Sequence, residues 1–270
     1  MTTPAMAPVV LLERPSATVA VIRANQPPRN AMTPELMAAF AGALSEVRAD
    51  PTLRALVIAA NGDHFCAGAD LSSNELPGVP QVLRGPPGDA ERLAAVYAAF
   101  LSLVDLPIPT VAAVQGGAVG GGFGLACACD FRVVTGDTRF SAPFARLGIA
   151  PGMGLTEFLP RLLGIPRAKA MLLLGDALNG EDAAASGFAY RCVPRENLDT
   201  AAIELAERLA TNAPAVVRWT KAAIHRAIAL DVRATSQNEA LAQALTFLAD
   251  DAREGVAAFR ERRPPKFTGG

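Results

Sequence analysis

The chain has few of the residues from which metal sites and disulfide frameworks are built. It holds four cysteines and two histidines among 270 residues. Cys127 and Cys129 lie two apart in an apolar run, and no spacing typical of a metal site occurs. Four cysteines in a chain of this length do not make a disulfide scaffold, so we expect buried thiols in a reducing compartment. We accordingly expect a cytoplasmic protein without a metal or a separate cofactor.

The sequence has no large excess of charge, and we expect neither a leader nor a membrane-spanning segment. The net charge is −1, and charged residues make up 19% of the chain against 51% hydrophobic residues. This balance gives no electrostatic footprint for nucleic acid and permits self-association. The start of the chain has neither the basic nor the apolar region of a signal peptide. Residues 106–129 carry no charge, but their prolines and glycines favour a strand, a turn and a helix over a membrane span.

What the sequence does have is a recurring order of strand, glycine turn and helix. Residues 17–24 (ATVAVIRA) alternate as a half-buried strand does. Residues 53–60 and 109–116 are short apolar runs, typical of strands buried on both faces. Thr33 followed by Pro34 is a typical helix start. We therefore expect an α/β fold built from crossover units.

The second half of the chain favours helices. Before it, residues 72–90 are rich in proline and glycine and predict an irregular loop. Beyond about Leu155 the pattern is helical, interrupted only by a short strand in residues 188–194 (FAYRCVP). We divide the chain into an αβ core, residues 1–200, and a C-terminal helical region, residues 201–270.

Two strand-to-helix turns would leave backbone amides free for a ligand: residues 64–71 (HFCAGADL) and 116–125 (GGAVGGGFGL). The start of a helix presents unpaired N–H groups and the positive end of its dipole, which suits a developing oxyanion. Glycine lets a ligand approach the backbone closely. A nucleotide-type glycine turn is the alternative, but the chain lacks the G-x-G-x-x-G fingerprint with an acidic residue about 20 positions later.

Together and in this order, the motifs resemble the crotonase superfamily, the enoyl-CoA hydratase/isomerase family. The resemblance runs through PPRNAM, HFCAGADL, PIPTVAAVQGGAVGGGFGLACACDFRVV, RFSAPFARLGIAPGMG, GEDAAASGFAYRCV and REGVAAFRERRPPKF. It implies a core of ββα units wound as a right-handed spiral. It also implies a C-terminal helical region that helps to close the pocket and builds homotrimers, often paired into hexamers. The implied ligand is an acyl-CoA thioester, as in fatty acid metabolism, with coenzyme A as part of that ligand.

The resemblance also assigns residues to the acyl-CoA site. In this family two backbone N–H groups hold the thioester oxygen, and they fall here on Ala69 and Gly121. Loss of one such donor typically costs about 3 kcal/mol of transition-state stabilisation. Arg29 and Lys266 match positions of cationic side chains near the nucleotide, with Lys266 acting from the chain end across a subunit boundary. The expected substrate-binding residues are Arg29, Ala67, Ala69, Asp70, Leu71, Gly121, Phe144 and Lys266.

The two glutamates with which hydratases of this family move protons are absent. The matching positions hold Gly124 and Phe144, and syn hydration requires two carboxylates that share a water. The aryl-CoA dehalogenase branch and the dienoyl-CoA isomerases use an acid at a further position, where this chain has Gly152. Ordinary two-glutamate hydration is therefore not expected.

Other groups remain as candidates for moving a proton. Glu157, one turn past the glycine loop, is the best single candidate for an acid or base in the pocket, and a carboxylate on the helix surface is the alternative. We expect Asp130 and His64 to be structural. Two hypotheses stay open: an acyl-CoA enzyme of lyase or isomerase type that uses a different acid or base, and an acyl-CoA-binding protein that has lost the chemistry.

Overall fold

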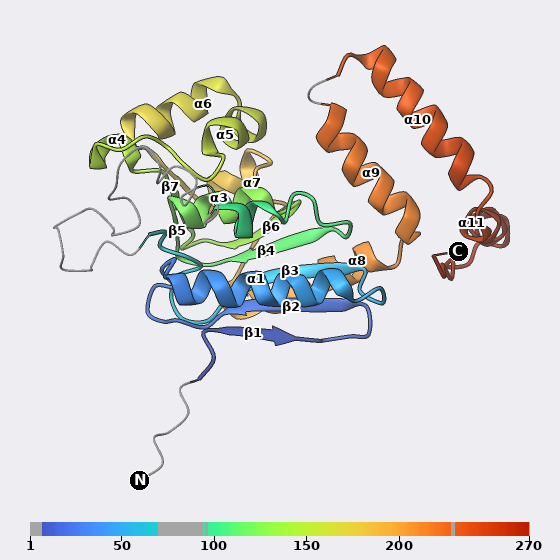
Figure 1. The fold of residues 1–270 in the computed structure, drawn as a ribbon, viewed down its shortest axis with the longest axis horizontal. Coiled ribbons are helices and arrows are strands. Elements are labelled where there is room, and N and C mark those ends of the chain that lie inside the picture. The colour runs from blue at the N-terminus through green and yellow to red at the C-terminus, as the bar shows by residue number, and fades with distance from the viewer. Residues whose placement is uncertain (1–6, 70–93, 95–96, 228–229, 270) are drawn as a thin grey trace, which may run out of the picture.

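A six-stranded sheet forms the centre of the molecule (Figure 1). The computed structural model describes residues 7–69, 94, 97–227 and 230–269. The strands follow the order β1-β2-β3-β4-β6-β9; β1 pairs antiparallel with β2, and all other neighbours pair parallel. Their bounds are β1 Val10–Glu13, β2 Val19–Ala24, β3 Ala55–Ala60, β4 Thr110–Val114, β6 Phe131–Thr135 and β9 Arg191–Val193.

Both faces of this sheet are covered by helices. In β2, Ala20 and Ile22 belong to the cluster that includes Phe40 of α1 (Pro34–Ala49), whereas Val19 and Val21 belong to the cluster on α8 (Leu198–Ala210). The strand pattern of residues 17–24 predicted one buried face, and that was wrong because α8 covers the second face. The apolar runs of β3 and β4 are buried throughout, as predicted.

The start of α1 follows its sequence signal. The Thr33 side chain accepts a hydrogen bond from the Leu36 amide, and Pro34 occupies the first helical position. This cap satisfies one of the amides that a helix start leaves unpaired. Leu36, Met37 and Phe40 then turn one face of the helix into the core.

A second, three-stranded sheet stands beside the first. It has the order β5-β7-β8, with bounds β5 Gly117–Val119, β7 Arg139–Ser141 and β8 Ala177–Asn179. The α3 helix (Gly121–Ala128) follows β5 directly and is buried along its whole length. Residues 106–129 therefore form strand, turn and helix, as predicted. No helix among the described residues is both long and apolar enough to cross a membrane.

The second half of the chain is mainly helical. Two short strands interrupt it: the predicted β9, and β8, which the sequence did not indicate. The helical elements are α4 Phe144–Leu147, α5 Leu155–Leu163, α6 Ile165–Lys169, the π-helical turn η2 Ala170–Leu174, α7 Gly180–Ala185, the 3₁₀ turn η3 Arg195–Asn197, α8, α9 Pro214–Ala227, α10 Val232–Thr246 and α11 Asp250–Glu261. Residue 200, our expected boundary, falls inside α8, which packs on the sheet. The helices that stand beside the core are α9, α10 and α11 (Figure 1). The loop expected at residues 72–90 lies outside the described residues.

A buried ion pair ties α9 to the core. The Lys221 Nζ atom lies 2.8 Å from Asp130 Oδ2 and also donates to the Ile108 carbonyl at 3.0 Å. The same carboxylate accepts from the Thr110 amide at 2.8 Å and lies 3.7 Å from His225 Nε2. With these partners Asp130 is structural, as expected from the sequence.

Candidate active site

The two glycine-bearing turns meet at the carboxyl edge of the parallel sheet. The segment of residues 65–69 runs beside β5: the Cys66 amide donates to the Gly117 carbonyl at 3.1 Å, and the Val119 amide donates to the Cys66 carbonyl at 3.0 Å. On its other side the Met32 amide donates to the Gly68 carbonyl at 2.8 Å. The segment before Ala69 is thus hydrogen-bonded on one side to β5, which leads into Gly121, and on the other side to the segment that contains Met32.

Gly68 brings the two backbone amides of interest close together. Its φ is +79°, and a Cβ there would lie 2.5 Å from the Val119 carbonyl oxygen and 3.4 Å from the Gly121 nitrogen. Only glycine fits this approach. The peptide N–H of Ala69 follows Gly68 directly in the chain, so both amides of interest lie near Gly68. Among the described residues, neither amide has an acceptor in the backbone hydrogen-bond network.

The turn into α3 is closed around its own glycines. Gly120 has φ +53° and is the N-cap of α3, so the Gly121 N–H stands in the first turn of the helix, where no intrahelical partner exists. A Cβ on Gly121 would meet the Met32 sulfur, and one on Gly122 would meet the Cys66 carbonyl. The space where a side chain of Gly121 would stand is therefore lined by Met32 and is sensitive to any added side chain.

Asn30 holds the loop that follows β3, and sequence reasoning missed it. The residue is fully buried with φ +48°, a conformation that asparagine tolerates better than most residues. Its side-chain amide donates to the Asn61 and His64 carbonyls, each at 2.8 Å. The only signal was its place in PPRNAM. Asn30 fixes the loop that leads to Ala69.

His64 has a structural partner. Its Nδ1 atom accepts a hydrogen bond from the Gly117 amide at 2.9 Å. A ring nitrogen that accepts is unprotonated, so the neutral ring carries its proton on Nε2. This agrees with the structural role expected from the sequence.

Arg132 stabilises the far end of α3. Its buried guanidinium donates to the Ala126 carbonyl at 3.1 Å, to the Cys129 carbonyl at 2.8 Å and to the Phe188 carbonyl at 2.6 Å. A cation at the carboxyl end of a helix satisfies its last carbonyls and complements its dipole. Arg132 thereby anchors the helix whose first turn carries Gly121.

Apolar groups occupy the positions where a carboxylate would act. A Cβ on Gly124 would lie 2.5 Å from the Met153 Cβ and 2.8 Å from the Met153 carbonyl oxygen, so this position has no room for a side chain. The Phe144 ring lies against Gly120: its outermost carbon is 3.6 Å from the place that a Cβ on Gly120 would take. The wall beside the two amides therefore consists of Met32, Met153 and Phe144.

Glu157 does not join this wall. Its carboxylate is 53% exposed and pairs with Arg161, one turn along α5, at 3.2 Å. The surface alternative is therefore the correct one, because Glu157 starts the exposed face of α5. The thiols offer no nucleophile either, since burial raises the pKa of Cys66 to about 11 and that of Cys127 to about 12.

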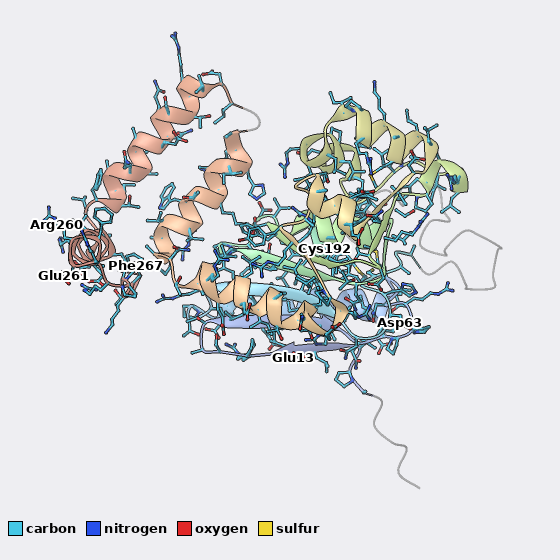
Figure 2. All side chains as sticks on the ribbon, turned by 180° about the vertical axis from the view of Figure 1, so that it is seen from behind. Glu13, Asp63, Cys192, Arg260, Glu261 and Phe267 are labelled. Atoms are coloured by element: carbon cyan, nitrogen blue, oxygen red, sulfur yellow. The ribbon has the colours of Figure 1, made fainter. Side chains whose placement is uncertain are left out.

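The other expected binding residues are distributed unevenly. The Ala67 amide donates to the Arg29 carbonyl at 3.0 Å, so the exposed Arg29 lies beside the segment that leads to Ala69. Asp70 and Leu71 lie outside the described residues. Lys266 is at the other edge of the sheet: the neighbouring Phe267 carbonyl accepts from Arg54, which precedes β3, at 3.1 Å. Figure 2 shows Phe267 and Asp63, which follows β3, on opposite sides of the core.

The edge of the sheet near Lys266 and the edge near the Ala69 and Gly121 amides are separated by the length of β3. The strand has six residues, which corresponds to about 20 Å at ~3.3 Å per residue. Within one subunit, Lys266 is therefore not brought together with Ala69 and Gly121. In the described part of the chain, no group of three or more His, Cys, Asp or Glu side chains is placed to hold a metal ion.

Comparisons with known proteins agree on one family. A family model described as enoyl-CoA hydratase/isomerase matches residues 14–270. The mitochondrial enoyl-CoA hydratase domain-containing protein 2 of Bos taurus is 35% identical over 273 residues, covering 97% of this chain and 88% of that protein. The crotonyl-CoA hydratase of Syntrophomonas wolfei is 32% identical over 261 residues, covering 96% and 97%.

Solved structures give the same result for the fold. The crystal structure of an enoyl-CoA hydratase from Bacillus anthracis matches with a TM-score of 0.86 and 30% identity, covering 97% of this chain and 100% of that chain. Sequence, motif order and fold thus point in one direction. The chain belongs to the enoyl-CoA hydratase/isomerase family, the crotonase superfamily.

Proposed function

We propose that this protein binds an acyl-CoA thioester and polarises its carbonyl with the backbone N–H groups of Ala69 and Gly121. The observation that supports the proposal is the packing of Gly68 on the turn into α3: a Cβ on Gly68 would lie 3.4 Å from the Gly121 nitrogen, and the Ala69 amide follows Gly68 in the chain. Fixed donors aimed at one oxygen stabilise the negative charge that an enolate places there. The positive end of the α3 dipole adds to this effect.

The chemistry that follows differs from ordinary two-glutamate hydration. Met153 fills the space at Gly124, and Phe144 presents a phenyl ring where the second carboxylate would stand. Relatives named as hydratases support an enzyme of lyase or isomerase type acting on an acyl-CoA. The second candidate, a binding protein without turnover, is favoured by the apolar wall of Met32, Met153 and Phe144.

The nucleotide end of the ligand would be held by cations from two subunits. Arg29 lies beside the segment of Ala67, at the side of the molecule where the amides are. Lys266 lies at the opposite edge of its own sheet, so it would serve the site of a neighbouring copy. This arrangement requires a homo-oligomer.

The C-terminal helices offer the surface for such an oligomer. Large apolar side chains are exposed along α9 to α11 in the isolated chain: Trp219, Ile224, Leu241, Leu245, Phe247 and Phe259. Monomeric proteins rarely expose extended apolar patches, which mark interaction sites. We propose that a second and a third copy cover them, giving a trimer or a pair of trimers.

Binding calorimetry with crotonyl-CoA tests the function. The wild-type protein should bind the thioester, and Gly121→Val should lose binding while it keeps its circular dichroism spectrum, because the added side chain enters the space of Met32. Hydration of crotonyl-CoA should be far below an ordinary enzyme's median of about 10 s⁻¹. A wild-type protein that binds no CoA thioester would refute the proposal.

A further inference from the structure

The Tyr97 hydroxyl packs against Gly152, the residue that precedes Met153 of the apolar wall. Tyr97 lies in the helical residues 97–101 and is partly buried. A Cβ on Gly152 would clash with the Tyr97 hydroxyl oxygen and would lie 2.9 Å from the ring carbon that bears it. The phenol thus occupies the space that the missing side chain of Gly152 leaves free.

Gly152 links Tyr97 to the apolar wall of Met32, Met153 and Phe144. Gly152 is bonded to Met153, whose Cγ would lie 3.6 Å from a Cβ on Gly121 and whose carbonyl closes the space at Gly124. The residue that contacts the Tyr97 phenol, Gly152, and the residue that contacts the turn into α3, Met153, are therefore neighbours in the chain. A small acyl group held by the two amides would lie against this wall.

The three side chains that the sequence offered for moving a proton or for a structural role, His64, Glu157 and Asp130, have partners among the described residues. His64 accepts from Gly117, and Glu157 pairs with Arg161 on the surface. Asp130 is surrounded by Thr110, Lys221 and His225. Between residues that the structure describes, the Tyr97 hydroxyl forms no hydrogen bond.

We propose that the Tyr97 hydroxyl is the proton donor of this site and delivers its proton to the α-carbon of the bound acyl group. The inference rests on the proposed function, that is, on an enolate held by the Ala69 and Gly121 amides. Water adds its oxygen lone pair to the β-carbon of an α,β-unsaturated thioester and releases a proton to solvent. The enolate electron pair then takes the Tyr97 proton, forming the α C–H bond and restoring the thioester carbonyl. The phenolate regains a proton from solvent, and the net reaction is addition of one water.

A neutral phenol suits the role of an acid. Burial raises the pKa of Tyr97 above its ordinary value, so the group is protonated at neutral pH and is available as a donor. Gly152 is part of the arrangement, because a methyl group there would take the place of the hydroxyl.

The test compares Tyr97→Phe with Tyr190→Phe. The chain has two tyrosines, and Tyr190 is 47% exposed and stacks edge-on against Phe131, away from the wall. Hydration of crotonyl-CoA is followed over hours by chromatography of the product, and affinity is measured by calorimetry. Tyr97→Phe should bind crotonyl-CoA within about threefold of the wild type and lose about 100-fold or more in rate, as removal of a general acid does. Tyr190→Phe should leave both values unchanged, and Gly152→Ala should lower the rate as Tyr97→Phe does.

A second readout does not depend on turnover. In the Tyr190→Phe background, tyrosinate absorbance reports Tyr97 alone, and its titration midpoint should lie above the ordinary value of about 10 and shift when crotonyl-CoA binds. The assignment is overturned, while the binding proposal stands, if the titration midpoint of Tyr97 does not shift when crotonyl-CoA binds. A Tyr97→Phe rate equal to that of the wild type has the same consequence. A wild type that binds crotonyl-CoA without any turnover also overturns it. A wild type that binds no thioester refutes the proposed function itself.

Discussion

The backbone of Met153 fills the space that a side chain at Gly124 would need. A Cβ there would lie 2.5 Å from the Met153 Cβ and 2.8 Å from its carbonyl oxygen. The absence of a carboxylate at this position is therefore built into the packing of the loop before α5 against α3. A single substitution cannot restore a glutamate at this position without moving that loop.

This contact predicts the cost of the smallest possible change. Gly124→Ala should destabilise the protein by about 1–3 kcal/mol, the usual penalty for overpacking a filled site. Gly42→Ala is the matched control, since a Cβ at Gly42 meets nothing within 4 Å in the interior of α1 and should stabilise by up to about 1 kcal/mol. Urea denaturation measures both. Equal effects at the two positions would show that Met153 yields easily.

Asn30 should control the position of the loop before Ala69. Asn30→Asp keeps the shape and the acceptor for the Gln26 amide but removes the amide hydrogens that reach Asn61 and His64. Two carbonyls then lose their partners, and a carboxylate faces them, so we expect a loss of about 1–3 kcal/mol or more in stability. Weaker acyl-CoA binding should accompany it. Asn212→Asp, at an exposed position beyond α8, is the control, and unchanged stability of Asn30→Asp would contradict the role.

The ion pair that anchors α9 should make stability depend on pH in the acid range. Burial alone would raise the pKa of Asp130, but His225 and the charge of Lys221 act in the opposite direction and leave it below its ordinary value. A lowered pKa stabilises the folded state fully above the unfolded value of about 3.9. The contribution is lost as the pH falls through the folded pKa. Asp130→Asn should therefore be less stable at pH 7 and lose less stability between pH 5 and pH 3 than the wild type. Parallel curves for the two proteins would contradict this.

The exposed apolar side chains of α10 predict an oligomer that can be dissociated. Leu241→Glu combined with Leu245→Glu should reduce the mass in sedimentation from a trimer or hexamer to smaller species. Gln243→Glu, on the same helix, adds charge at a polar position and should leave the mass unchanged. The dissociated protein should also bind acyl-CoA more weakly, because Lys266 lies near the start of β3 and the amides of its own subunit lie beyond the end of this strand, which is about 20 Å long. A wild-type monomer would contradict the account.

Local signals predicted the elements that build the site. The Thr33 cap, the apolar runs of β3 and β4 and the glycine turn before α3 are all found where the sequence indicated. The order of the motifs indicated the family. Each of these features depends on neighbours in the chain, which is why a single sequence reveals them.

What the sequence did not reveal depends on contacts between distant segments. Tyr97 meets Gly152, and Met153 meets Gly124, only because the loop before α5 folds back onto α3. The strand β8 has three residues and exists through its antiparallel pairing with β7. Glu157 looked like a pocket acid by its distance along the chain, but its direction is set by the exposed face of α5 and by Arg161.

The carbonyl stretching frequency of a bound thioester tests the central claim most directly. Crotonyl-CoA labelled with ¹³C at the carbonyl, compared with unlabelled ligand by difference infrared spectroscopy, reports the hydrogen bonds to that oxygen alone. With the wild-type protein, the band should move to lower frequency than in water, because in the proposed complex the Ala69 and Gly121 amides are donors held in place by the backbone, whereas water molecules must reorient. A bound thioester whose carbonyl band lies at or above its frequency in water would show that the two amides do not hold the oxygen, and would contradict the account.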